Sequence, residues 1–187
     1  PQALHNVANA LAAAALARSF GVEPAFVRQG LVDFEPAAHR VAHVATINGV
    51  KYINDSKATN CHAAQTALMS FDNVVWIAGG DAKGQVFDEL VQKTYTHLKH
   101  VILLGRDQAA VHQALSVHAP QIPVMTFEQL DPSVINEVVQ AAASVAESGD
   151  VVLLAPACAS WDMFKNYSHR GDAFAEAVNN LGNTNGT

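Results

Sequence analysis

The sequence predicts an α/β fold: a doubly wound, mostly parallel Rossmann-like sheet with a hairpin at its start, preceded by a short helical segment. Short apolar runs alternate with helical patterns along most of the chain, as in sheets built from strand–helix–strand units. Several runs are continuously apolar, which is typical of strands covered on both faces. Because helices that join parallel strands make right-handed crossovers, the later strands are expected to pair in parallel.

The first 36 residues predict two helices. An Ala-rich helical pattern over 5–19 is closed by Gly21. Pro24 suits the first turn of a second helix, which runs to about Leu31. Phe34-Glu35-Pro36 then interrupts the pattern, because the residue before a proline is disfavoured in a helix. We therefore place a domain boundary there and expect the opening piece to be too small to fold alone.

From Arg40 the pattern changes to that of strands, and Asn48-Gly49 predicts a hairpin turn before a second strand that ends at Ile53. Helices and strands alternate after the hairpin. We expect helices at 60–71, 86–97, 107–117, 131–147 and 160–181, and strands at 74–78, 101–105, 123–127 and 151–155. Residues 183–187 are expected to be a disordered tail.

Composition and charge exclude several classes of protein. The 187 residues are 50% hydrophobic and 15% charged, which is a globular composition. A net charge of -6 argues against sequence-independent nucleic-acid binding, which needs clustered Lys and Arg. No apolar run reaches the roughly 18 residues of a membrane span, and we expect no signal peptide before the first helix. Cys61 and Cys158 are expected to be free thiols of a cytoplasmic protein, and the histidines lack metal-ligand spacing.

The stretch Asn54-Asp55-Ser56-Lys57-Ala58-Thr59-Asn60 lies between a predicted strand and a predicted helix. Its residues from Asp55 to Asn60 offer an acceptor, a cation, two hydroxyls and an amide, at the kind of strand end where open α/β sheets bind ligands. The stretch favours a nucleotide site. The alternative is a solvated loop in which Thr59 or Asn60 caps the helix.

Two further clusters follow predicted strands. In Gly79-Gly80-Asp81-Ala82-Lys83-Gly84 the glycines would let backbone amides approach an anion while Lys83 supplies charge, but a simple turn is the alternative. The cluster matches neither the P-loop nor G-x-G-x-x-G. In 155–160 the small side chains would allow close contact with a ligand, and Ser160 would cap a helix that starts beside it. Arg170 would lie near the start of that helix. It would contact a ligand there, or it would be a surface or ion-pair residue.

Asn6 and Asn9 are three residues apart and therefore share a helix face. A side-chain amide can pair with the N6/N7 edge of adenine, although helix capping is the simpler explanation. Arg40 lies just beyond the predicted boundary. It would reach a phosphate, or it would be the polar first residue of a strand without a ligand role.

Taken together, these clusters resemble the Mur ligase family, most closely its members that add D-glutamate. The matching stretches, in the family's order, are His5-Asn6-x-x-Asn9, His39-Arg40, Asn54 to Asn60, Gly79-Gly80-x-x-Lys83-Gly84, Pro156-Ala157-Cys158-Ala159-Ser160-x-Asp162, Phe164 and Arg170-Gly171. The sequence departs from the family pattern at Ala155, where a serine is expected, and at Tyr167, where a phenylalanine is expected.

The resemblance implies a three-domain ATP-dependent ligase of peptidoglycan precursor synthesis. Residues 1–36 would be the last helices of its central ATPase domain, and 37–182 its C-terminal domain. The implied substrates are D-glutamate, ATP with Mg²⁺, and UDP-N-acetylmuramoyl-L-alanine. The P-loop, the magnesium-binding acid and the UDP-sugar domain would lie elsewhere, so this chain alone is expected to be inactive.

The resemblance also implies a role for individual residues, without any covalent enzyme nucleophile or metal ligand in this chain. Asn6 and Asn9 would contact adenine. The implied contacts to the rest of ATP are Arg40, Asp55 and Lys57, and those to D-glutamate are Thr59, Lys83, Ser160 and the backbone around Tyr167. Two other hypotheses are a free-standing dinucleotide-binding domain, disfavoured because G-x-G-x-x-G is missing, and a folded fragment without a ligand.

Overall fold

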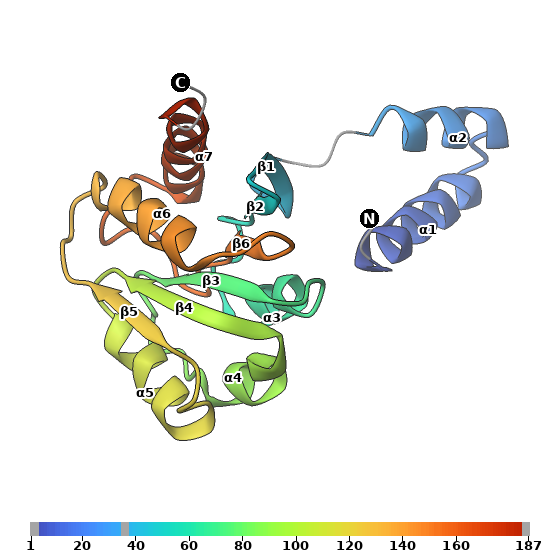
Figure 1. Cartoon of the computed structure of the whole chain (residues 1–187). Helices are drawn as coiled ribbons and strands as arrows, with labels where there is room; N and C mark the ends of the chain where they lie inside the picture. Colours follow the sequence, from blue (N-terminus) through green and yellow to red (C-terminus); the bar gives the residue numbers. More distant parts are fainter. Residues whose placement is uncertain (1–3, 35–37, 185–187) are drawn as a thin grey trace. The chain divides into compact units, whose positions relative to one another are not determined.

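The computed structural model describes residues 4–34 and 38–184 (Figure 1). Contacts within the chain divide it into two compact units, Pro1–Ala37 and Ala38–Thr187. The first unit contains the two predicted helices, α1 (Leu4–Ser19) and α2 (Pro24–Val32). None of its described residues is buried, and large apolar side chains such as Phe20 and Phe26 are exposed.

The second unit is built on a six-stranded sheet in the order β1-β2-β6-β3-β4-β5. Its strands are β1 (Ala42–Ile47), β2 (Val50–Asn54), β3 (Val74–Gly79), β4 (Leu98–Leu104), β5 (Val124–Phe127) and β6 (Val151–Leu154). The strands β1 and β2 form the predicted antiparallel hairpin, and its turn residues Asn48 and Gly49 have φ of 52° and 80°. All other neighbours pair in parallel. The fold-class prediction is therefore confirmed.

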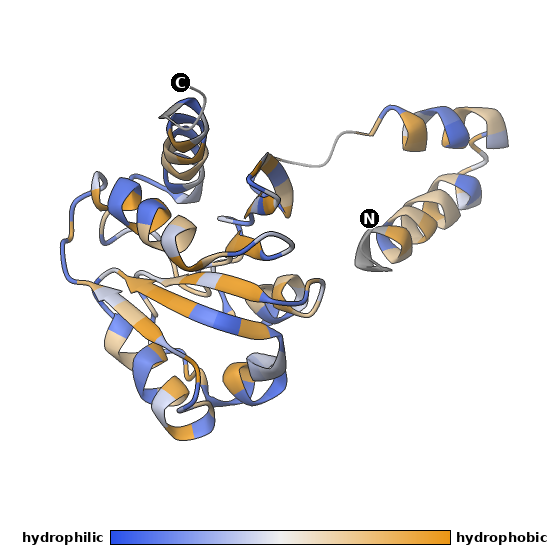
Figure 2. Cartoon of the chain, viewed as in Figure 1, coloured by the Kyte–Doolittle hydropathy of each residue, from blue (hydrophilic) through white to orange (hydrophobic). Residues whose placement is uncertain are grey.

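Helices cover both faces of this sheet (Figure 1). They are α3 (Cys61–Leu68), α4 (Asp88–Thr94), the 3-10 helix η1 (Tyr95–His97), α5 (Gln108–His118), α6 (Val134–Val145) and α7 (Tyr167–Thr184). One hydrophobic core lies between the sheet and α3, α4 and α5, and the other between the sheet and α6 and α7. Along β3, Trp76 points to the first core and Ile77 to the second, which explains why β3 and β6 carry no charged residue (Figure 2).

The last helix differs from the prediction at both ends. It begins at Tyr167 rather than Ser160, and it continues through Asn183 and Thr184, which were expected to be in the loose tail. Residues 185–187 of that tail lie outside the described residues. Ser160 begins only a single turn, in which its carbonyl accepts from the amide of Phe164 at 2.7 Å, and Ala159 before it forms a bridge with Asp81.

No helix in the described part of the chain has both the length and the apolar character needed to cross a membrane. Both cysteines are free, as expected.

Candidate functional site

The three polar loops predicted at strand ends lie side by side, because β2, β6 and β3 are neighbours in the sheet and run in parallel. The amide of Ala157 donates to the carbonyl of Ala58 at 2.9 Å, joining the loops after β6 and β2. Asp81 and Ala159 exchange two backbone hydrogen bonds of 2.9 Å, joining the loops after β3 and β6. The loops therefore form one continuous rim at the carboxyl edge of the sheet.

The buried side chain of Arg170 ties two of these loops together from α7. Arg170 is 1% exposed, and its Nη2 donates to the carbonyls of Ser56 at 3.0 Å and Cys158 at 3.1 Å. Its Nε donates to Ser56 Oγ at 3.0 Å. Burial lowers the pKa of this guanidinium to about 10, so it stays cationic at neutral pH. Arg170 is thus buried rather than a surface residue, and within the described part of the chain its side chain bonds to backbone carbonyls and a hydroxyl.

The segment that enters the second unit is anchored to the same rim through His39. Asn54 Nδ2 donates to His39 Nδ1 at 3.1 Å and to the carbonyl of Gly171 at 2.8 Å. The carbonyl of His39 accepts from the amide of Lys57 at 3.1 Å. A Cβ at Gly171 would collide with the His39 ring, which explains why glycine follows Arg170. These contacts place Arg40 next to the loop after β2.

Asp55 is the buried carboxyl group of the rim. It is 5% exposed, and its Oδ1 accepts from the amide of Val41 at 3.1 Å. Burial raises the pKa of Asp55 to about 7, although the Val41 amide and the positive charge of Arg40 both act to lower it. A buried carboxyl group with such a shifted pKa, at the sheet edge where open α/β folds bind ligands, is a candidate functional group.

Replacing Asp55 by asparagine should change the pH dependence of stability. Because the folded-state pKa lies above the usual 3.8, the folded state binds the proton more tightly, and the free energy of unfolding falls as pH rises from about 4 to about 7. The Asp55→Asn variant lacks this decline and should exceed the wild type by about 1 kcal/mol or more at pH 8. Urea unfolding of both proteins between pH 4 and pH 8 measures the two free energies of unfolding. If the difference between them did not change with pH, the raised pKa of Asp55 would be contradicted.

Two cations accompany Asp55 on this side of the rim. Arg40 is exposed, and Lys57 places its Nζ 5.6 Å from the centre of the Tyr167 ring, a cation–π contact. The carbonyl of Tyr167 accepts from Ser56 Oγ at 2.7 Å. The structure thus brings Arg40, Asp55, Lys57 and Tyr167 together around the loop after β2.

The loop after β3 presents the side chain of Lys83 rather than its backbone amides. The amides of Gly79, Ala82 and Lys83 all donate within the protein. A Cβ at Gly79 would meet the carbonyl oxygen of Leu104 at the end of β4, and a Cβ at Gly80 would meet that of Ala159 in the loop after β6. These glycines therefore allow the loops to pack closely, and the expectation that they open amides to an anion is wrong for these three donors. Lys83 itself is exposed.

Ser160 does not cap a helix, contrary to the sequence prediction, because α7 starts later. Asn166 accepts from the amide of His169 at 2.8 Å and caps α7 instead. Ser160 is 2% exposed, and its carbonyl accepts from the amides of Met163 and Phe164. On the loop after β2, Asn60 caps α3 by accepting from Ala63 at 2.9 Å. Capping therefore explains Asn60 but not Thr59, which is half-buried at the rim.

Residues 39–158 match the profile of the family described as Mur ligase, glutamate ligase domain. The chain belongs to this family. It is 58% identical over 182 residues to the UDP-N-acetylmuramoylalanine--D-glutamate ligase of Streptomyces avermitilis, and 56% identical over 181 residues to that of Thermobifida fusca. Each match covers 97% of this chain but 39% of the relative, so the chain spans well under half the length of these relatives.

Solved structures support the Mur ligase fold at lower identity. The UDP-N-acetylmuramate-alanine ligase of Thermotoga maritima matches 95% of this chain and 38% of its own, with a TM-score of 0.65 at 19% identity. A pseudomurein peptide ligase type C from Methanothermus fervidus matches 94% of this chain and 36% of its own, with a TM-score of 0.65 at 16% identity. At these identities the likeness concerns the fold alone.

Two pairs of residues lie outside the three loops of the rim. Asn6 and Asn9 both lie on α1, in the first unit, and the Asn9 side chain is exposed. Arg106 and Asp107, in the loop after β4, were not among the predicted site residues. The signal that would have found them is the one used for the other loops: charged residues directly after a buried parallel strand.

Proposed function

We propose that this chain is the C-terminal part of an ATP-dependent ligase that joins D-glutamate to UDP-N-acetylmuramoyl-L-alanine in peptidoglycan precursor synthesis. The observation that carries the proposal is the shared rim. It holds Thr59, Lys83 and Ser160 on three neighbouring loops, in a domain whose relatives bear the name of this ligase. On this proposal residues 1–36 are the last helices of the ATPase domain, and the protein works in the cytoplasm.

The chemistry needs an activated carboxyl group, because a carboxylate and an amine do not condense in water. Transfer of the γ-phosphoryl group of ATP to the carboxylate of the UDP-sugar substrate gives an acyl phosphate and ADP. The amine of D-glutamate attacks the acyl carbon, and the tetrahedral intermediate expels phosphate to leave the amide. Catalysis then consists of positioning and charge neutralisation. The buried thiol of Cys158 suits no nucleophilic role, because burial raises its pKa to about 12.

The charges on the rim fit the two anionic ligands. Lys83 would pair with a carboxylate of D-glutamate, which Thr59, Ser160 and the backbone at Tyr167 would also contact. Arg40 and Lys57 would contact the phosphates of ATP, and Asn6 and Asn9 its adenine. The raised pKa of Asp55 fits a ribose contact, since a hydroxyl that donates to the carboxylate would stabilise its charged form.

Mg²⁺ would neutralise phosphate charge in such a reaction. The described residues hold no group of three or more His, Cys, Asp or Glu side chains able to bind a metal ion. Mg²⁺ bound together with ATP typically takes one or two carboxylates and completes its shell with phosphate oxygens and water.

Calorimetric titration of the chain with D-glutamate tests the proposal. We expect weak binding of D-glutamate and much weaker binding of L-glutamate, because two carboxylates and an amine must match fixed partners at once. A titration with NAD serves as the control for the dinucleotide-binding hypothesis. Equal heats for the two enantiomers, or tight NAD binding without any response to D-glutamate, would contradict the proposal.

A further inference from the structure

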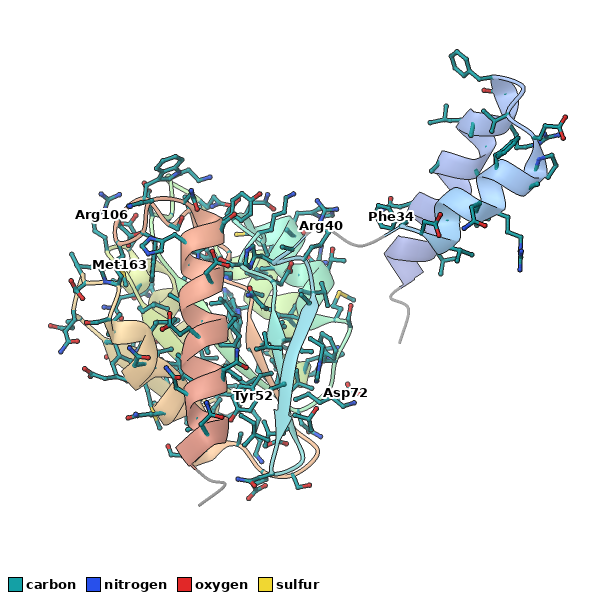
Figure 3. All side chains as sticks on the ribbon, turned by 90° about the horizontal axis from the view of Figure 1, so that it is seen from above. Phe34, Arg40, Tyr52, Asp72, Arg106 and Met163 are labelled. Carbon is teal, nitrogen blue, oxygen red and sulfur yellow. The ribbon has the colours of Figure 1, made fainter. Side chains whose placement is uncertain are left out.

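The loop after β4 packs closely against two loops of the rim. The amide of Asp107 donates to the carbonyl of Gly80 at 3.1 Å, and the amide of Arg106 donates to Asp162 Oδ2 at 2.8 Å. A Cβ at Gly105, where φ is +88°, would meet the backbone of Gly80. Only glycine therefore permits this approach. Arg106 lies near Met163 at the edge of the unit (Figure 3).

Carboxylates of the loops after β3 and β4 hold the backbone around Lys83. Asp107 Oδ2 accepts from the amide of Ala82 at 2.8 Å, and Asp81 Oδ1 accepts from the amide of Lys83 at 3.0 Å. Lys83 has φ of 51°, a conformation that an L-residue adopts at a cost. The two hydrogen bonds offset that cost and fix the direction in which the Lys83 side chain leaves the loop.

Arg106 balances the charge of these carboxylates. Its Nη2 lies 3.2 Å from Asp81 Oδ1, and its Nε lies 3.6 Å from Asp107 Oδ1. The Arg106 side chain is 55% exposed, and ion pairs at such exposure add little stability. The effect of Arg106 is instead local. Without it, the uncompensated carboxylates of Asp81 and Asp107 would lie near Lys83 and repel an anionic ligand.

We propose that Arg106 and Asp107 are positioning residues of the D-glutamate site. Asp107 fixes the loop that carries Lys83, and Arg106 cancels the charge of Asp81 and Asp107 so that Lys83 remains attractive to a dicarboxylate. This inference rests on the proposed function, since it takes D-glutamate as the ligand of Lys83.

Steady-state kinetics of the full-length ligase that carries this chain test the charge role of Arg106. Arg106→Gln should raise KM for D-glutamate about tenfold, while kcat and KM for ATP change by less than about twofold. The double variant Arg106→Gln/Asp107→Asn should regain much of this loss, because asparagine keeps an acceptor for Ala82 but removes the charge. A residue that only stabilises the fold would not show this rescue.

Lys99 provides the matched control, because it also bridges two carboxylates and lies at the opposite end of β4. Its Nζ is 2.6 Å from Glu147 Oε2 and 2.8 Å from Asp150 Oδ2. Lys99→Gln should leave KM for D-glutamate unchanged. The inference would be overturned if KM for D-glutamate were unchanged in Arg106→Gln, or if Asp107→Asn brought no rescue. In either case a wild-type ligase that is active with D-glutamate would leave the proposed function intact. A wild-type ligase that ignores D-glutamate would refute both.

Hydrogen exchange in the ligand-free chain tests the role of Asp107 without any ligand. Asp107→Ala should speed exchange of the Ala82 amide about tenfold or more, whereas Asp107→Asn and Lys99→Gln should not. Unchanged exchange at Ala82 in Asp107→Ala would overturn the inference even if the ligase proves active with D-glutamate.

Discussion

Replacing Lys83 by alanine should lower kcat/KM for D-glutamate about 100-fold in the full-length ligase, with little change in KM for ATP. Lys83 is the exposed cation of the loop after β3, and its amide and that of Ala82 are held by two carboxylates. A carboxylate of D-glutamate would lose its charge-assisted hydrogen bond with the Lys83 ammonium group, and the alanine side chain has no donor to replace it.

The control for this experiment is Lys51→Ala. Lys51 is also exposed, but it lies at the amino end of the same sheet, where β2 begins. We expect kcat/KM of this variant to stay within about twofold of the wild type. A Lys83→Ala enzyme that matches the Lys51→Ala enzyme would remove Lys83 from the site and leave the proposed function without its main cation.

Replacing Arg170 by methionine should destabilise the second unit by about 3 kcal/mol or more, because several buried oxygen atoms would lose their donors at once. The oxygens are the Oγ and carbonyl of Ser56 and the carbonyl of Cys158, whereas the carbonyl of Ala159 would keep the amide of Asp81 as a donor. For a unit of this size the expected fall in Tm is about 6–12 °C. Differential scanning calorimetry of the chain measures it.

Arg170→Lys separates geometry from charge, since an ammonium group keeps the charge but lacks the planar fork of donors. We expect it to recover less than half of the lost stability. The exposed Lys93, which pairs with Glu89 one turn away on α4, supplies the control: Lys93→Ala should shift Tm by less than about 2 °C. A methionine variant as stable as the wild type would show that Arg170 does not tie the loops together.

Strand ends made much of the candidate site predictable. Asp55, Lys57, Thr59 and Lys83 were found because charged and hydroxyl groups begin where an apolar run stops, and the ends of parallel strands share one edge. The same rule applied to the run 101–105 would have pointed to Arg106. A serine before a helical pattern is a cap signal, which predicts a cap at Ser160, but the long helix begins only at Tyr167, where Asn166 provides the cap.

The sequence by itself determined the fold class, the hairpin and the loops that carry the polar residues, because alternation, turn residues and strand ends are local signals. Only the tertiary structure decided that β6 lies between β2 and β3, that Arg170 is buried beneath their loops, and that Arg106 and Asp107 support Lys83. These features depend on contacts between residues far apart in the chain. Strand order and packing decide which side chains meet at the rim, and no local sequence pattern encodes either of them.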